Sequence, residues 1–591
     1  MKLRADIDEK FKWDLSHLCK SDEEFYSRLE KLKESLPKFQ KYKGKLNTKD
    51  MIWDYLCLDR EFSKELEPIY QYASLKGSEV ASDNSANEMS ETISKVLSKL
   101  SYDTAFITTE FHSLSDEFLD DIASDPKFSE YDKMFRDIKE DKKHILSEKE
   151  EKLLAGMDFL GGFSENMEKL SDVDLEFGEI EDEKGEKHSL SQSNYGKYIR
   201  SNDRTLRKNA IVKLNGQFGK HINMLSSNYI SEVKANCYFA KIRNYDSALA
   251  SALENEEVEP KVYKTLVEMV NKNLPLLFDY FKFKQKQMGL DEFYIYDTSA
   301  EFAHGENKKE YSYDEAIELI KKATAPLGEE YVGLVQKAKD ERWIDVFPNK
   351  DKHSGAFATS TYYQHPYVLT NFEGQLDDVF TLAHELGHAM HYYHSNKNQP
   401  KEKAEYTIFL AEIASITNEM LLANYLLKNS NSPQEKKAIY NKIFDDVKST
   451  TYRQTMFAEF EEKIHSLNEQ DVPLTKDRLC KEYYALVEKY FGKDVKLVDE
   501  IKYEWARIPH FFTAFYVYKY ATGMICAISF ANRILSGQKG AVEDYYKFLS
   551  AGGSDTPMAI LKSAHCDITQ EETFENCFNY LAKLLNDWKK L

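Results

Sequence analysis

The chain has 591 residues, with 100 acidic against 80 basic side chains and a formal net charge of −20 at pH 7. A surface of this sign repels nucleic-acid phosphates and anionic lipid headgroups, which argues against either as a partner. Only 23 glycines and 13 prolines occur, and this composition is typical of long helices and argues against an all-β fold.

The sequence contains no recognisable targeting or membrane-spanning segment. Its first residues, MKLRADIDEKFKWDLSHL, lack the apolar core of a signal peptide, and no apolar run approaches the roughly 20 residues that cross a bilayer. The seven cysteines are scattered and show no CxxC spacing, so neither a disulfide framework nor a thiolate zinc site is expected. We predict a cytoplasmic protein without a nucleic-acid or membrane partner, whose oligomeric state the sequence leaves open.

Hydrophobic periodicity predicts helices over most of the chain. Apolar residues recur at intervals of three and four from Ser21 onward. Residues 173–191 then alternate apolar and polar side chains around the turn sequence EDEKGE, which predicts a β-hairpin. Helical patterning resumes near Asp203. Residues 355–372, rich in β-branched and aromatic side chains, predict a second extended segment, and the chain is mostly helical again from Asp377 to its last residue.

The sequence TLAHELGHAMHYYHSNKNQP at residues 381–400 carries the clearest chemical pattern. His384 and His388 are four residues apart, so on a helix their imidazoles stand on one face and can bind a single ion. Glu385 is offset by about 100° around the helix and can reach a water molecule at that ion without being a ligand. This is the HExxH arrangement. Without a metal, the same pattern would describe an amphipathic helix whose histidines are solvated or hydrogen-bonded.

A catalytic zinc ion needs a third protein ligand, and two residues compete for that role. His394 lies ten residues after His384, the offset of the HExxHxxGxxH pattern, in which a glycine lets the chain turn back to the metal. His391 occupies that glycine position, so the helix should continue and carry His394 about 15 Å along its axis from His384. We therefore expect His391 and His394 to lie on the helix surface or in a substrate cleft.

The rival ligand is Glu412, in a second helix predicted from near Glu405 to about Leu427. A polar break with Pro400 separates the two helices, which should pack antiparallel. Glu412 then lies about two turns into the second helix, on an otherwise apolar face, where a carboxylate needs a partner such as a dication. Glu419, seven residues later, either holds a ligand histidine in place or forms an ordinary ion pair.

HELGH, followed 24 residues later by the glutamate of FLAEIAS, resembles the M3 family of zinc metallopeptidases, and the whole chain is similar to its oligoendopeptidase F branch. Further matches follow the family's order along nearly the full length: WDLSHL at 13–18, HPYVLTNF at 365–372, RIPHFFTAFYVYKYATG at 507–523 and GGSDTPMAILKSA at 552–564. The resemblance implies one zinc ion per chain, with Glu385 activating a water molecule and the metal bound by His384, His388 and Glu412.

The resemblance also implies a mainly α fold. We expect a large helical two-lobed structure around a deep channel that contains the zinc site and admits peptides but excludes folded proteins, with the small β-hairpin and a short β-sheet near the active site. Within it we predict an N-terminal helical lobe over residues 1–112, a helical segment with the hairpin over 113–200, and the zinc metallopeptidase domain over 201–591.

An oxyanion formed during peptide hydrolysis needs a hydrogen-bond donor, and PHFFTAFYVYKYATG at residues 509–523 offers several. Aromatic side chains at such spacing also commonly serve a core. The candidates are His510, Tyr516, Tyr518 and Tyr520. The resemblance suggests His510 and a tyrosine near the end of the motif, which we place at Tyr520, with Tyr516 and Tyr518 as substrate-binding candidates.

The chain departs from the family pattern at three positions. Phe512 and Thr513 stand where tyrosines are expected, and His565 stands where the branch usually has glycine. The extended segment before the zinc helix supplies the remaining substrate-binding candidates, Tyr367, Val368 and Leu369, because a strand along the rim of a cleft can pair with the main chain of a peptide.

These observations predict a zinc-dependent endopeptidase that acts on short unfolded oligopeptides. The alternative enzyme is a metallocarboxypeptidase or peptidyl-dipeptidase with the same zinc site, which would need a fixed cation to capture the terminal carboxylate of its substrate. A peptide capped at both ends distinguishes the two, since only an endopeptidase cuts it. A non-catalytic helical peptide-binding protein would show no chelator-sensitive turnover.

Overall fold

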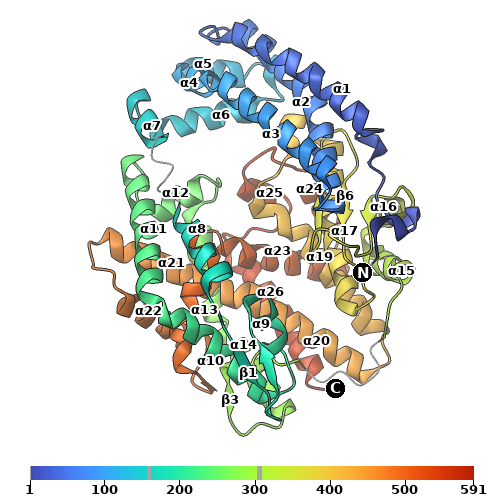
Figure 1. The fold of residues 1–591 in the computed structure, drawn as a ribbon, viewed down its shortest axis with the longest axis vertical. Coiled ribbons are helices and arrows are strands. Elements are labelled where there is room, and N and C mark those ends of the chain that lie inside the picture. Colours follow the sequence, from blue (N-terminus) through green and yellow to red (C-terminus); the bar gives the residue numbers. More distant parts are fainter. Residues whose placement is uncertain (1, 156–161, 302–308) are drawn as a thin grey trace.

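The computed structural model describes residues 2–155, 162–301 and 309–591. It is mainly helical, as predicted, and Figure 1 shows a group of N-terminal helices above a larger body that contains the C-terminus. The N-terminal helices are α1 (Asp22–Ser35), α2 (Lys49–Glu79), α3 (Asn84–Thr104), α4 (Phe106–Ser113), α5 (Asp116–Ala123), α6 (Asp132–Asp141) and α7 (Glu148–Ala155).

The larger body consists of the helices that follow α7. Within the described residues, none of the helices is both long and apolar enough to cross a bilayer. The first half of the body contains α8 (Gly162–Lys169), α9 (Gln192–Ile199), α10 (Arg204–Lys220), α11 (Ile222–Ile242), α12 (Ala248–Glu254), α13 (Pro260–Lys272), α14 (Leu274–Gln287), α15 (Tyr313–Thr324) and α16 (Glu329–Asp340). The second half contains α17 (Leu376–Asn398), α18 (Lys401–Ala404), α19 (Ile408–Asn429), α20 (Pro433–Val447), α21 (Arg453–Glu469), α22 (Lys476–Phe491), α23 (Tyr518–Leu535), α24 (Ala541–Leu549), α25 (Pro557–Ser563) and α26 (Glu571–Trp588).

Short strands form three small sheets in the described parts of the chain. The hairpin predicted over 173–191 is confirmed as β1 (Glu179–Glu181) paired antiparallel with β2 (Lys187–Ser189). A second sheet pairs β3 (Phe293–Tyr294) in parallel with β7 (Val495–Lys496). The third sheet has the order β4 (Ile344–Asp345), β6 (Tyr367–Leu369) and β5 (Phe357–Thr359), with β6 parallel to β4 and antiparallel to β5.

Two hydrophobic cores lie on either side of this third sheet. The first core runs from Trp13 to Ile138 and includes Tyr367 and Leu369 of β6, whereas Val368 packs into the second, larger core. Successive side chains of a strand point to opposite faces, so β6 contributes to both cores at once. The first core continues through α5 and α6, and the predicted domain boundary at residue 112 therefore divides it.

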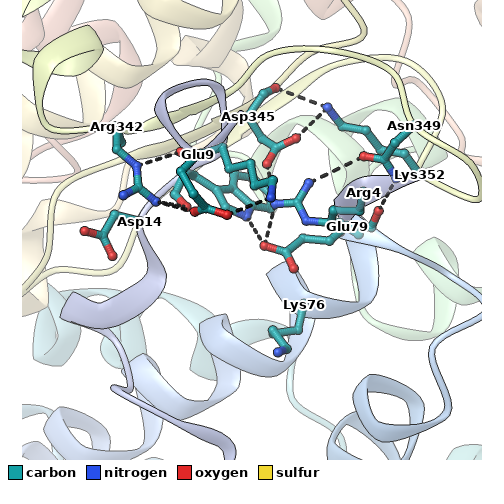
Figure 2. Close-up of polar contacts among 12 residues, drawn as sticks. Arg4, Glu9, Asp14, Lys76, Glu79, Arg342, Asp345, Asn349 and Lys352 are labelled. Atoms are coloured by element: carbon teal, nitrogen blue, oxygen red, sulfur yellow. Dashed lines mark hydrogen bonds and ion pairs between the residues drawn. The ribbon is translucent and has the colours of Figure 1, made fainter. Parts of the chain in front are cut away.

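A buried network of charged side chains joins the N-terminal segment, α2 and the sheet (Figure 2). The Arg4 guanidinium donates to Glu79 Oε1 at 2.8 Å and to Asp345 Oδ2 at 2.6 Å. Lys352 Nζ lies 2.6 Å from the other carboxylate oxygen of Asp345, and both of these side chains are almost fully buried. Trp13 adds a hydrogen bond from its indole to Glu79 at 2.6 Å. The network therefore ties β4, and with it the sheet, to the N-terminal lobe.

Replacing Arg4 with glutamine should destabilise the protein, because the buried carboxylates of Glu79 and Asp345 would lose their shared cation. Removing one partner of a buried ion pair costs about 3–5 kcal/mol, so we expect a lower midpoint in urea unfolding. Lys10→Gln is the control, since Lys10 lies 3.9 Å from Asp8 on the exposed surface, where ion pairs contribute little. Equal midpoints for the two variants would contradict this account of the network.

Candidate metal centre

Helices α17 and α19 are in direct backbone contact. At Gly387, in the middle of HELGH, a β-carbon would lie 2.5 Å from the Cα atom of Ser415 and 2.7 Å from the carbonyl oxygen of Ala414. Only glycine leaves room for such an approach. The contact turns the face of α17 that carries His384 and His388 toward the first turns of α19.

Three ligand atoms converge between these helices. Glu412 Oε2 lies 3.3 Å from His384 Nε2 and 3.6 Å from His388 Nε2, and the two imidazole nitrogens are 3.2 Å apart. A tetrahedral zinc ion with bonds near 2.0 Å holds its ligand atoms about 3.3 Å from one another. The spacing of the three side chains therefore fits one ion of this size, and their donor set of two imidazoles and a carboxylate suits zinc.

Glu419 lies on the far side of the first imidazole. Its Oε1 atom is 2.7 Å from His384 Nδ1, a contact that keeps the proton on Nδ1 and directs the Nε2 lone pair toward Glu412 and His388. Asn418, next to it in α19, donates to the carbonyl oxygen of Ala383 at 3.0 Å. This buried bond ties the helices together beside the convergent atoms.

The electrostatics of the cluster favour a positive charge at its centre. Burial opposes protonation of His384, but its hydrogen bonds with Glu412 and Glu419 outweigh burial and raise its pKa to about 10. Burial and the positive charge of His384 lower the pKa of His388 to about 4. Burial works against ionisation of Glu412, yet the two histidines lower its pKa to about 2. Two carboxylates thus converge on one imidazole, and a bound cation would satisfy both.

Glu385 lies beside the cluster without belonging to it. The three convergent residues are His384, His388 and Glu412, and the Glu385 carboxylate instead lines a cavity of about 490 Å³ together with His384 and Glu419. Glu385 is 7% exposed, and burial, with the nearby negative charges of Glu412 and Glu419, raises its pKa to about 7. A carboxylate with this pKa can accept a proton from a water molecule at neutral pH.

Comparisons with known proteins show which family the chain belongs to. The family model described as Peptidase family M3 matches residues 197–580, and the model described as Oligopeptidase F matches residues 110–177. The chain is 34% identical over its whole length to oligopeptidase PepF of Bacillus subtilis (strain 168), covering 88% of that protein. It is also 36% identical over its whole length to the oligoendopeptidase F homolog of Borreliella burgdorferi, covering 99% of that protein.

The chain belongs to peptidase family M3. It is a metallopeptidase of the oligoendopeptidase F type, and a metal ion is its cofactor. A solved structure from Chlamydophila abortus superposes with a TM-score of 0.95 at 33% identity, covering 100% of this chain and 99% of that one. Oligoendopeptidase-F from Enterococcus faecium superposes with a TM-score of 0.73 at 32% identity, covering 96% of this chain and 99% of that one.

In this M3 peptidase, α23 brings the aromatic motif next to Glu412. A β-carbon at Gly523 would lie 3.5 Å from the Cβ atom of Glu412, and Tyr520 stands one turn earlier on the same helix. The Tyr520 hydroxyl is 3.3 Å from His510 Nε2. Burial, assisted by the neighbouring Tyr516 and by Glu412, raises the pKa of Tyr520, so its phenol stays protonated as a donor. The structure therefore groups His510, Tyr516 and Tyr520 near the metal cluster.

Four of the predicted substrate-binding residues lie in the core of the M3 peptidase instead. Tyr518 is 1% exposed and packs against Tyr263. Tyr367, Val368 and Leu369 are fully buried, and their strand, β6, pairs with β4 on one side and β5 on the other. The prediction that residues 367–369 form a free strand at the rim of the cleft is therefore wrong, because neither edge of β6 is open to a peptide.

Strand β5 takes the place that was predicted for β6. Among the described strands it pairs only with β6, so its other edge carries no strand. Gly355 and Ala356, just before β5, line the cavity next to His384 and Glu385. The extended segment 355–372 was predicted correctly, but the strand with an unpaired edge is its first part.

His391 and His394 are also buried, which corrects their predicted place on the helix surface or in a cleft. The helix does continue through both, but they are only 1% and 2% exposed. The His391 ring stacks on Tyr406 with centroids 3.7 Å apart, and His394 packs edge-on against Tyr546. Burial lowers the pKa of His391 far below its ordinary value and that of His394 to about 4. Both imidazoles are therefore neutral packing groups.

The departure at His565 has a local explanation. Its backbone has a φ of 53°, a left-handed conformation that glycine adopts most easily. Its Nδ1 atom lies 2.9 Å from Asp544 Oδ1, and Asp544 also pairs with Arg533. The position is on the surface, with the His565 side chain 75% exposed.

Glu461 of α21 is a site residue that sequence analysis missed. Its Oε1 atom accepts a hydrogen bond at 3.0 Å from the backbone of Phe515, which has a φ of 55°. This bond holds the strained loop between His510 and Tyr520 in place. The sequence FAEFEEKIH did contain a pattern that could have identified Glu461. Glu461 is an acidic residue beside the buried Phe460 and Ile464, and the same kind of pattern identified Glu412.

The close contact at Gly387 predicts a loss of metal affinity on adding one methyl group. In Gly387→Ala the methyl group must displace the backbone of α19 and move Glu412 away from the two histidines, so we expect weaker zinc binding and a stability loss of about 1–3 kcal/mol. Titration with a zinc chelator measures the first effect. Gly333→Ala in α16 is the matched control, since a β-carbon there meets nothing within 4 Å. An unchanged zinc affinity in Gly387→Ala would contradict the role of this contact.

Glu461 predicts a pH-dependent difference in stability. Burial raises its pKa from 4.5 to about 8, so the folded protein holds a proton that the unfolded chain has released, and Glu461 costs stability as the pH rises through this window. Glu461→Gln does not titrate and can still accept from Phe515. We expect the Tm of the variant, relative to wild type, to increase from pH 5 to pH 9. A difference in Tm that is constant across this range would argue against a buried protonated carboxyl group.

Proposed function

We propose that this M3 peptidase is a zinc-dependent endopeptidase that hydrolyses internal bonds of short unfolded oligopeptides. One zinc ion per chain would be held by His384, His388 and Glu412. The observation that carries the proposal is the convergence of their three ligand atoms beside a buried carboxylate, Glu385, which is not one of them. An open fourth position next to a base is the arrangement that a catalytic zinc site needs.

Each residue of the cluster has a separate task in the proposed reaction. Zinc, when bound, polarises the scissile carbonyl and lowers the pKa of a water molecule. Glu385 takes the proton from that water and delivers it to the leaving amine. Glu419 holds His384 in the tautomer whose Nε2 faces the metal. Tyr520 donates its phenolic hydrogen to the oxyanion, and His510 holds the phenol in position from 3.3 Å.

The substrate class follows from the relatives and from the sheet. The relatives are named oligopeptidase and oligoendopeptidase F, which supports short peptides as substrates. The unpaired edge of β5 could hydrogen-bond the main chain of an extended peptide, whatever its side chains. Tyr516, half-buried next to His510 and Tyr520, remains a candidate for contact with the substrate. Binding through the main chain requires an unfolded segment and so favours peptides over folded proteins.

Replacing Glu385 with glutamine tests the mechanism. The amide cannot accept the proton, so turnover should fall by at least about 100-fold, in line with the usual contribution of a general base, while zinc content stays at one ion per chain. An internally quenched peptide capped at both ends measures the rate and also distinguishes an endopeptidase from an exopeptidase. Wild-type turnover by Glu385→Gln would rule out this role.

Two alanine variants serve as metal-binding controls. Glu412→Ala removes a proposed ligand and should lower the zinc content measured after dialysis. His394→Ala removes a neutral, buried imidazole and should leave the zinc content of the folded protein unchanged. If instead His394→Ala loses zinc and Glu412→Ala retains it, the proposed ligand set is wrong.

A further inference from the structure

A second cavity, of about 220 Å³, lies among α9, α20, α21 and the 3₁₀ helix Asp499–Arg507. This volume is several times the ~30 Å³ that one water molecule occupies in the liquid. Apolar side chains, including Met456 and Phe491, make up part of its wall, and charged side chains make up much of the rest. None of its lining residues belongs to the metal cluster.

The charged wall holds two guanidinium groups against one carboxylate. Glu504 Oε1 accepts from Arg453 at 2.7 Å and from Arg507 at 3.3 Å, and its Oε2 accepts from the hydroxyl of Tyr483 at 2.7 Å. Glu504 is 8% exposed, and the side chains of Arg453 and Arg507 are 29% and 17% exposed, so two partly buried positive charges share one buried negative charge. One positive charge is left over.

The other acidic residues of the wall do not supply the missing negative charge. Asp445 pairs with Lys448 at 3.1 Å and with Lys284 at 3.4 Å. Asp446 pairs at 3.1 Å with Lys442, which lies outside this wall. The surplus charge at Arg453 and Arg507 therefore stays uncompensated by the carboxylates of the cavity.

One buried hydrogen-bond donor in this wall also lacks a partner among the described residues. Arg507 Nε is buried and has no hydrogen-bond partner among the described residues. The ring of Tyr195 lies under the Arg507 guanidinium, 5.2 Å from it, and burial raises the pKa of Tyr195 to about 12, so that its hydroxyl remains a donor. A buried donor such as Arg507 Nε is normally satisfied, and an anion in the cavity would satisfy it.

The cavity lies next to the cavity that Glu385 lines. Asp446 of this cavity pairs at 3.1 Å with Lys442, and Lys442 lines the cavity beside His384 and Glu385. A peptide bound at the metal cluster would therefore lie close to this cavity.

We propose that this cavity binds the free α-carboxylate of a peptide substrate, through the guanidinium groups of Arg453 and Arg507. The planar fork of arginine matches a carboxylate in geometry and charge, and the apolar wall can accept the last side chain. The inference rests on the proposed peptidase function. It adds a requirement on the substrate, because the cavity would hold the carboxylate at a fixed place relative to the metal. The favoured peptides are those whose C-terminus reaches the cavity while the bond to be cut lies at the metal.

The experiment compares three internally quenched peptides with one core sequence: the free acid, the C-terminal amide, and an amide whose last residue is glutamate. Wild type should cleave the acid with a kcat/KM roughly tenfold or more above that of the amide, mainly through KM, since a charge-assisted contact made in the ground state acts on binding. The glutamate amide should behave like the plain amide. Equal kcat/KM values for acid and amide would overturn the proposal.

Variants locate the effect at the cavity. Arg507→Gln should bring the ratio of acid to amide kcat/KM close to one, and Arg507→Lys should keep part of it. Arg136→Gln is the matched control, since Arg136 is an exposed arginine on α6 that pairs with Asp132 at 3.2 Å, and it should keep the wild-type ratio. A full acid preference in folded Arg507→Gln would overturn the assignment.

Two further outcomes have distinct meanings. If the glutamate amide is cleaved as well as the acid, the cavity accepts any carboxylate and the assignment to the α-carboxylate is wrong. If none of the three peptides is cleaved by zinc-loaded wild type, the proposed function fails, and the carboxylate proposal fails with it. The comparison of peptides needs only the wild-type protein, so a poorly folding variant does not prevent the test.

Discussion

The backbone contact between α17 and α19 at Gly387 is the constraint on which the candidate site depends. Two helices that carried side chains at this point would stand farther apart, and Glu412 would not reach the histidines across the gap. The approach allows three ligand atoms to lie within 3.2 to 3.6 Å of one another. Asn418 adds a buried hydrogen bond across the same pair of helices. The glycine inside HELGH is thus as much a part of the site as the histidines beside it.

Burial and charge then give chemically similar residues different properties. Three glutamates lie within one small region, but Glu412 and Glu419 contact imidazoles while Glu385 faces a cavity. Glu412, whose pKa the two histidines lower, is suited to stay ionised and to face a cation, and Glu385 is suited to exchange a proton. The same argument separates the histidines of α17, because His391 and His394 are packed among aromatic rings and remain neutral.

The small sheet joins the catalytic helices to the N-terminal lobe. Alternate side chains of β6 enter the two hydrophobic cores, and β4 is tied to the N-terminal lobe through the Arg4 network. Residues that follow β6, such as Thr370 and Phe372, line the cavity beside Glu385. The position of the N-terminal lobe is therefore coupled mechanically to the wall of the site.

The sequence by itself determined the helical class, the hairpin, the HExxH helix and its pairing with Glu412, because each depends on local periodicity or on two helices joined by a short connection. Only the tertiary structure decided that Tyr367, Val368 and Leu369 are a buried central strand, that His391 and His394 are packing residues, and that Glu461 supports the loop at Phe515. These outcomes depend on which distant segments cover a given face. A buried strand and a strand with a free edge can have the same residue pattern, since the difference lies in the neighbours that fill each side.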